Sequence, residues 1–144
     1  RELTAYLAAH TDALPTTDEL ERIDFALAAL AVETAVARHC GTMEQVFTLT
    51  GTALAQTGKD LTEVERLVMT GGAVVHAKRV ADIAAHALYS TKQPQSLRPF
   101  KAEILVDHKY ILAAMGLLAG HHPASALNVM KKELVSHGFA QQKN

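Results

Sequence analysis

The sequence predicts a helix-rich α/β fold with a small sheet, and three observations support this class. Apolar residues recur with helical spacing over residues 17–38 and again from Ala73 or His76 to Tyr89. Short runs at 66–70 and 102–107 are typical of strands. Because a helix separates these two strands, we expect a parallel pair joined by a right-handed crossover.

The first third of the chain is predicted to be helical. A short helix covers residues 2–10, and Thr16 with Glu19 has the spacing of a capping box before a long helix over 17–38. Apolar residues occupy every face in the middle of that helix, so we expect it to be buried nearly all round. Gly41 then fits a left-handed helix cap.

The middle of the chain begins with a predicted β-hairpin. Residues 45–60 are rich in strand-favouring Val, Phe and Thr side chains around a turn at Gly51 and Thr52. A short turn of helix is expected at 61–65, directly before the strand at 66–70.

The last third is predicted to contain a loop, a strand and two helices. Two prolines favour a loop over 90–100, and Asp107 follows the second strand, where it can cap a helix over 108–120. Pro123 suits the first turn of a final helix, which Gly138 closes.

Composition and charge exclude several classes of function. Fourteen basic and fifteen acidic residues nearly cancel, so the chain lacks the basic footprint of a protein that binds nucleic acid or an anionic membrane. The longest apolar helical stretch, 25–32, is too short to cross a bilayer. One cysteine and no apolar leader predict a cytoplasmic setting. Because the chain starts at Arg1, we expect a piece of a longer protein.

The glycine, histidine and cysteine patterns do not fit known catalytic or metal sites. Six residues separate Gly51 from Gly58, and Asp60 follows Lys59, whereas a P-loop needs four residues and a Ser or Thr. An exposed Gly-Lys turn of the hairpin is the alternative. The eight histidines lack zinc-ligand spacing, and Cys40 diverges on a helix from the histidine before it.

The carboxylates have structural explanations as well. Asp107 suits a helix cap better than an acid or base, and Glu63 and Glu65 belong to a solvated turn. We therefore predict no catalytic residue and no metal ligand in this chain.

Thr70, Gly71, Gly72 and Ala73 form the candidate binding site. They end the first strand of the predicted crossover and precede a helix, and ligands of open α/β sheets collect at that edge. A tight turn that needs a positive φ explains the two glycines equally well. A Rossmann dinucleotide site is disfavoured, because the G-x-G-x-x-G fingerprint is missing.

Four motifs give the chain a family resemblance. They read RHCG at 38–41, GKDLTEVERLVMTGGAVVH at 58–76, LRP at 97–99 and LVDHKYILAAMGLLA at 105–119. In order and spacing, over residues 15–136, they resemble the carboxy-terminal part of the MutL/GlmL family. These are glutamate mutase accessory proteins, distinct from the mismatch-repair protein of the same short name.

The resemblance implies a fold, a cofactor and a function. The fold is part of a ribonuclease-H-like half of an actin-like ATPase, which clasps ATP, with magnesium in the full-length protein. The function is that of an ATP-dependent reactivating factor, or chaperone, for an adenosylcobalamin-dependent mutase such as methylaspartate (glutamate) mutase. The adenosine motif of that fold is a strand ending in Gly-Gly, so the resemblance assigns nucleotide binding to Thr70, Gly71, Gly72 and Ala73. It gives no role to Lys59 or Asp60.

The same resemblance sets limits on this chain. The phosphate loops, the magnesium carboxylates and three strands of this half are expected upstream of Arg1. We therefore expect the 144 residues to be a single domain or the carboxy-terminal part of one, and neither to hydrolyse ATP nor to hold it tightly. The alternative is a helical docking module for a partner enzyme, with no nucleotide role. The sequence leaves open which mutase is served and whether a homo-oligomer forms.

Overall fold

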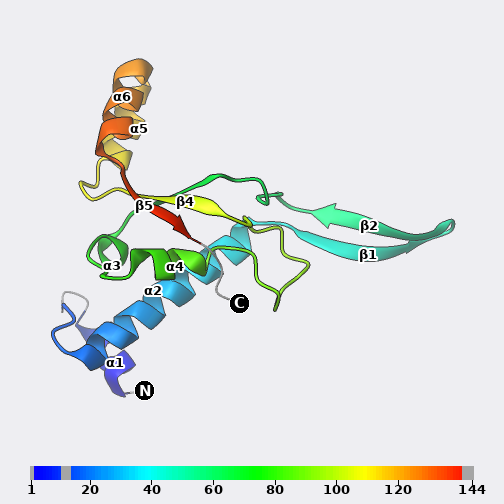
Figure 1. The fold of residues 1–144 in the computed structure, drawn as a ribbon, viewed down its shortest axis with the longest axis horizontal. Helices are drawn as coiled ribbons and strands as arrows, with labels where there is room; N and C mark the ends of the chain where they lie inside the picture. The colour runs from blue at the N-terminus through cyan, green and yellow to red at the C-terminus, as the bar shows by residue number, and fades with distance from the viewer. Residues whose placement is uncertain (1, 11–13, 141–144) are drawn as a thin grey trace.

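Six helices and two small sheets make up the described residues, 2–10 and 14–140, of a computed structural model. A central sheet carries helices along one side, while a long β-hairpin and a pair of helices project away from it (Figure 1). The mixed α/β class is confirmed. In chain order the elements are α1 (Glu2–Ala9), α2 (Asp18–His39), β1 (Thr42–Thr48), β2 (Gly51–Thr57), β3 (Arg66–Met69), α3 (Gly72–Val75), α4 (Val80–Ala85), β4 (Ala102–Val106), α5 (Leu112–Ala119), α6 (Pro123–Glu133) and β5 (Val135–Ala140).

The central sheet has the strand order β3-β4-β5. β3 and β4 run parallel, with Arg66 opposite Glu103 and Met69 opposite Val106, which confirms the predicted parallel pair. β5 lies antiparallel on the other side of β4, with an irregularity between Glu103 and Leu105. Because parallel strands end at one edge, the segments that follow β3 and β4 emerge at the same edge of the sheet.

The core lies between one face of this sheet and helices α2, α3 and α4. Ala102, Ile104 and Val106 alternate along β4 and are fully buried. They belong to one cluster with Val74 of α3 and Ile83 of α4. Full burial of a side chain the size of Ile83 contributes roughly 1.5–3 kcal/mol, so this layer fixes α3 and α4 against the sheet.

The first two helices are present, but α2 differs from its prediction. The predicted break between these two helices includes residues 11–13, which lie outside the described residues. Its N-cap is Thr17, whose hydroxyl accepts the N–H of Leu20 at 3.3 Å, so the capping box of Thr16 and Glu19 is wrong by one residue. The prediction that α2 is buried nearly all round is also wrong, because α2 packs on the α3–α4 side and buries two alanines.

Within the described residues, no helix is long and apolar enough to cross a membrane.

The predicted helix from Ala73 or His76 to Tyr89 is two short helices, α3 and α4, with a break between them. Val74 and Ile83 are nine residues apart, which places them on opposite faces of a continuous helix at 100° per residue. Both are buried in the same cluster. The break therefore lets both side chains reach the core.

The predicted hairpin is confirmed as β1 and β2, but its turn lies elsewhere. Leu49 and Thr50 form the turn, and Gly51 is already the first residue of β2. Gly58 and Lys59 are exposed and Gly58 bends the chain, as predicted, but they follow the end of β2 and do not form the turn of the hairpin. These two residues lie at the base of the hairpin.

The last predicted helix is shorter than expected. α6 begins at Pro123, as predicted, but ends at Glu133. Gly138, with φ 80°, lies inside β5 and does not close a helix. Ala140 of β5 pairs with Ala102 and is buried. Pairing with β4 and burial of this strand end therefore outweigh the helical pattern of the sequence.

Candidate functional site

The candidate site is the turn that follows β3. The chain leaves the strand at Thr70, bends at Gly71 with φ 106° and ψ 148°, and enters α3 at Gly72. L-residues rarely adopt the conformation of Gly71, so glycine is needed there. A Cβ on Gly72 would meet the hydroxyl of Tyr110 at 3.8 Å, an ordinary contact. Thr70, Gly72 and Ala73 are exposed.

The backbone of this turn offers hydrogen-bond donors. The N–H groups of Val74 and Val75 donate to the carbonyl oxygen of Gly71 at 3.0 and 2.9 Å. The N–H groups that precede Val74 have no carbonyl within the helix to bond. Since α3 has only four residues, its dipole contributes little. The site therefore depends on bare backbone more than on a helix terminus.

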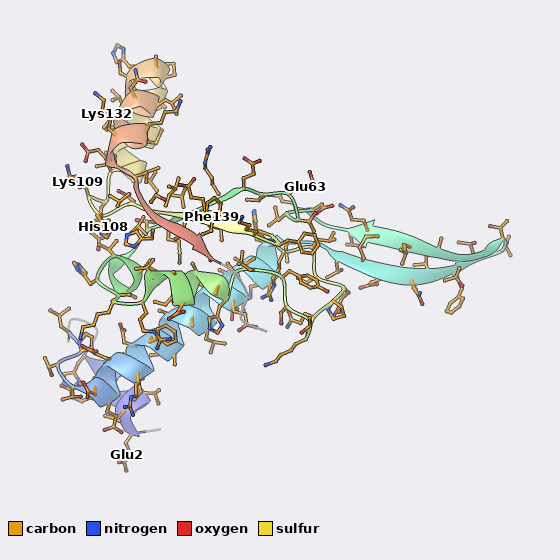
Figure 2. All side chains as sticks on the ribbon, in the orientation of Figure 1. Glu2, Glu63, His108, Lys109, Lys132 and Phe139 are labelled. Carbon is orange, nitrogen blue, oxygen red and sulfur yellow. The ribbon has the colours of Figure 1, made fainter. Side chains whose placement is uncertain are left out.

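The loop after β4 lies at the same edge of the sheet. Asp107 is buried, and its two carboxylate oxygens accept the N–H groups of Ile111 and Leu112, each at 3.0 Å. Asp107 therefore binds the start of α5 as predicted, but the helix begins at Leu112 and its N-cap is Ile111, so the prediction that it starts at 108 is wrong. Figure 2 shows His108 and Lys109 of this loop between α3 and the α5–α6 pair.

A pocket of about 660 Å³ lies directly after α3. Residues 76–79 form one wall, the amino-terminal half of α2 forms the other, and Phe25 and Ile83 add apolar surface. Because α3 has four residues, it separates the glycine turn from the pocket by roughly 6 Å along its axis. A volume between about 300 and 1,000 Å³ is typical of small-molecule sites.

Charged groups of both signs line this pocket. Lys78 forms an ion pair with Glu21, and the hydrogen bond and charge of that carboxylate raise the pKa of Lys78. The guanidinium of Arg79 lies 4.6 Å from the centre of the Phe25 ring and donates to Asp82 at 2.7 Å. An aromatic wall beside paired charges suits a planar polar ring system better than a hydrocarbon.

Comparison with known proteins identifies the family. A family model described as MutL protein matches residues 1–134. The chain belongs to the MutL family. It is similar to Protein MutL of Clostridium tetanomorphum, with 38% identity over 130 residues. These residues make up 90% of this chain and 28% of the relative, so the chain spans less than a third of that protein. No solved structure matches.

Three of the four MutL motifs meet at the base of the β1–β2 hairpin. The N–H of Gly41 donates to the carbonyl of Lys59 at 2.6 Å, and the N–H of Leu97 donates to the carbonyl of Gly41 at 2.9 Å. A Cβ on Gly41 would lie 2.3 Å from the oxygen of Thr57, and one on Gly58 would lie 2.9 Å from the Cα of Gly41. These two glycines therefore allow two backbones to touch.

This close approach also corrects the prediction of a left-handed cap at Gly41. α2 ends before Cys40, which is extended with φ −76° and ψ 159°. The thiol of Cys40 lies 3.3 Å from the hydroxyl oxygen of Ser96, which is buried. Cys40 is a packed, hydrogen-bonded residue of this junction, in agreement with the structural interpretation of its sequence position.

Lys59 and Asp60 gain structural roles from the same junction. Lys59 supplies the carbonyl that binds the backbone of the RHCG motif. Asp60 accepts the hydroxyl and the N–H of Thr62 at 2.6 and 2.9 Å, and these two bonds lower the pKa of the Asp60 carboxyl. The resulting turn replaces the helical turn expected at 61–65.

The LRP motif places a buried arginine under the predicted loop over 90–100, which is confirmed. Arg98 donates to the carbonyl of His86 at 3.3 Å and to the side-chain oxygen of Gln93 at 2.7 Å. Its Nε has no partner in the part of the chain that the structure describes. Sequence reasoning did not single out this residue, because arginine in a proline-containing loop is usually exposed.

The remaining candidates are not arranged for chemistry. Glu63 and Glu65 are exposed, and Figure 2 shows Glu63 pointing away from the body of the protein. His108 and His137 share a hydrogen bond between their Nε2 atoms at 2.9 Å. Across residues 2–10 and 14–140, no group of three or more His, Cys, Asp or Glu side chains could hold a metal ion.

Proposed function

We propose that this chain is the nucleoside-binding segment of a MutL-family, ATP-dependent reactivating factor for an adenosylcobalamin-dependent mutase in the cytoplasm, such as methylaspartate (glutamate) mutase. Family membership, shown by the match over residues 1–134, supports the link to a mutase system. In this proposal Thr70, Gly71, Gly72 and Ala73 hold the adenosine of ATP.

The observation that carries the nucleotide part is the bare turn at Gly71 and Gly72. It lies at the carboxyl edge of two parallel strands, where ligands of α/β folds bind. Packing inside the described chain does not explain Gly72, since a Cβ there has an ordinary contact. A flat ligand pressed against the backbone of Gly72 does explain it, and the pocket beyond α3 has room for a nucleoside.

The residues fit the nucleoside of ATP better than its phosphates. The turn offers free backbone and the pocket offers an aromatic wall, but no cluster of carboxylates for magnesium occurs among the described residues. When bound, ATP supplies the free energy of phosphoryl transfer. The role of this chain is to bind and orient the adenosine, while phosphate and magnesium ligands come from the longer part of a MutL protein.

A titration of the full-length protein with ATP tests this proposal. Gly72→Val places a branched side chain where the nucleoside would lie, so we expect the affinity for ATP to fall by tenfold or more, by steric exclusion. Gly116→Val is the matched control, because a Cβ on Gly116 meets nothing within 4 Å and Gly116 lies on α5. Equal ATP affinity in all three proteins would refute nucleotide binding at this turn.

The mutase part needs a separate experiment. A methylaspartate mutase inactivated by turnover is mixed with the full-length protein and fresh adenosylcobalamin. We expect activity to return with ATP, and not with buffer in its place or with the Gly72→Val variant. Recovery that is the same with and without ATP would remove the nucleotide from the proposed role.

A docking module without a nucleotide role is the second candidate. Large apolar side chains are exposed on the two projecting elements, with Phe47 88% exposed near the hairpin tip and Leu117 82% exposed on α5. A docking module would use apolar side chains of this kind to contact its partner. If Gly72→Val leaves ATP binding unchanged while Phe47→Ser and Leu117→Ser abolish co-purification with the mutase, this second function is the correct one.

A further inference from the structure

Tyr110 lies beside the glycine turn although it is distant in sequence. It belongs to the loop after β4, and β4 ends at the same edge of the sheet as β3. Its hydroxyl is the group nearest to a Cβ built on Gly72, at 3.8 Å. A molecule resting on the bare backbone of Gly72 would therefore contact the side chain of Tyr110 as well.

The backbone of Tyr110 is held in a conformation that tyrosine disfavours. Its φ is 55°, and it is the one non-glycine residue with positive φ in the part of the chain that is described. Asp107 holds both sides of it, because the Tyr110 N–H points to the Asp107 carbonyl at 3.4 Å while the Asp107 carboxylate binds Ile111 and Leu112. Strain of this kind persists where a surrounding structure fixes it, and it clusters at ligand sites.

The side chain of Tyr110 shows no structural role that would explain why its strained backbone is kept. It is 49% exposed, and its hydroxyl has no hydrogen-bond partner among the residues that the structure describes. A tyrosine that serves packing buries its ring or bonds its hydroxyl. Here a strained backbone presents a half-exposed ring and an unpaired hydroxyl to the Gly72 side of the turn.

We propose that Tyr110 is a nucleotide-contacting residue that forms the second wall of the Gly71–Gly72 site. Its hydroxyl hydrogen-bonds a polar atom of the bound nucleotide, and its ring lies beside the nucleotide at the edge of the Gly72 turn. This assignment rests on the proposed function and adds a residue from a different strand and loop to it. The strain at Tyr110 then has a use, since glycine at this position would relax the backbone but leave the site open on one side.

Tyr110→Gly separates binding from stability. In the full-length protein, titrated with ADP by calorimetry, we expect the affinity to fall about tenfold, the scale of losing one aromatic contact and its hydrogen bond. The thermal midpoint should stay or rise, because glycine accepts positive φ without strain. If Tyr110 served structure alone, ADP affinity would stay unchanged and the thermal midpoint would fall. Tyr6→Ala is the control, as Tyr6 is 46% exposed on α1 and should leave ADP affinity unchanged.

Tyr110→Phe keeps the ring and removes the hydroxyl, so it gives a second readout if the glycine variant folds poorly. We expect its ADP affinity to drop roughly two- to tenfold, the size of one neutral hydrogen bond. The two proposals fail differently. A wild-type protein that binds no ADP, or a Gly72→Val variant that binds it normally, overturns the proposed function. Normal ADP binding by Tyr110→Gly or by Tyr110→Phe, with Gly72→Val impaired, overturns the assignment of Tyr110 alone.

Discussion

Gly41 and Gly72 lack side chains for different physical reasons. At Gly41 the reason lies inside the chain, because a Cβ would be 2.3 Å from a backbone oxygen of Thr57, and backbone cannot rotate away. At Gly72 the nearest atom is the hydroxyl of Tyr110 at 3.8 Å, which leaves room for a methyl group. The first glycine is therefore required for folding, whereas the second becomes a requirement once a ligand occupies the turn.

The residue scale gives a direct stability prediction at Gly41. Gly41→Ala should destabilise the protein by about 2 kcal/mol, since overpacking against backbone forces a shift of the hairpin base. Denaturant unfolding measures this change. Gly116→Ala is the matched control and should stabilise by up to about 1 kcal/mol, because Gly116 is helical and a Cβ there meets nothing. Equal stabilities for the two variants would show that the close approach at Gly41 is not as described.

Asp60 predicts a dependence on pH. Hydrogen bonds from Thr62 hold its pKa below the ordinary value of 3.8. A lowered pKa in the folded state contributes stability above the unfolded pKa, and this contribution is lost as the pH falls through the folded value. Thr62→Val removes the hydroxyl hydrogen bond, which lowers this pKa more than the N–H bond does. We expect this variant to be less stable than the wild type at neutral pH, with a gap that closes in acid. A gap of constant size across the titration would contradict the link to Asp60.

At the scale of elements, short-range patterns predicted the strands well and the helices less well. β3, β4 and the hairpin follow from runs of strand-favouring residues, and Pro123 marks the start of α6. The break between α3 and α4 was missed because Val74 and Ile83 both pack against a sheet that local periodicity does not describe. β5 was missed because its pairing with β4 is a long-range contact, and its Gly138 resembles a helix cap.

Asp107 determines how α5 begins. Asp107→Ala should cost about 2 kcal/mol, because it leaves the N–H groups of Ile111 and Leu112 without their carboxylate acceptor in a partly buried place. Asp107→Asn keeps one acceptor oxygen and should lose about half as much. Thermal unfolding of both variants measures the difference. Wild-type stability in Asp107→Ala would mean that α5 begins without this cap.

At the scale of the whole molecule, the described part of the chain contains a three-stranded sheet with β3 at one edge. Among residues 2–10 and 14–140, β3 pairs on one side alone, and the sheet face opposite the helices exposes Val68 and Phe139. The matched relative is more than three times as long as its aligned part. Both observations agree with the expectation, drawn from the family resemblance, that further strands of this sheet lie in the rest of the protein.

The location of the proposed site could be predicted from the sequence only in part. The Gly71–Gly72 turn follows from the motif at the end of a strand. Tyr110 could not be found in this way, because its nearness to Gly72 depends on the parallel pairing of β3 with β4 and on a positive φ within its loop. The RHCG and LRP motifs had no assigned role in the sequence, and in the structure they meet Lys59 at the base of the hairpin.

Photolabelling tests the nucleotide site most directly. The full-length protein is irradiated with 8-azido-ATP, digested with trypsin and mapped by mass spectrometry. Cleavage after Arg66 and Lys78 isolates the peptide 67–78, which contains the glycine turn. Cleavage after Lys109 and Lys131 isolates the peptide 110–131, which contains Tyr110. We predict ATP-protectable label on one or both of these peptides. Label that ATP protects and that lies entirely on other peptides would contradict a nucleotide site at Gly71 and Gly72.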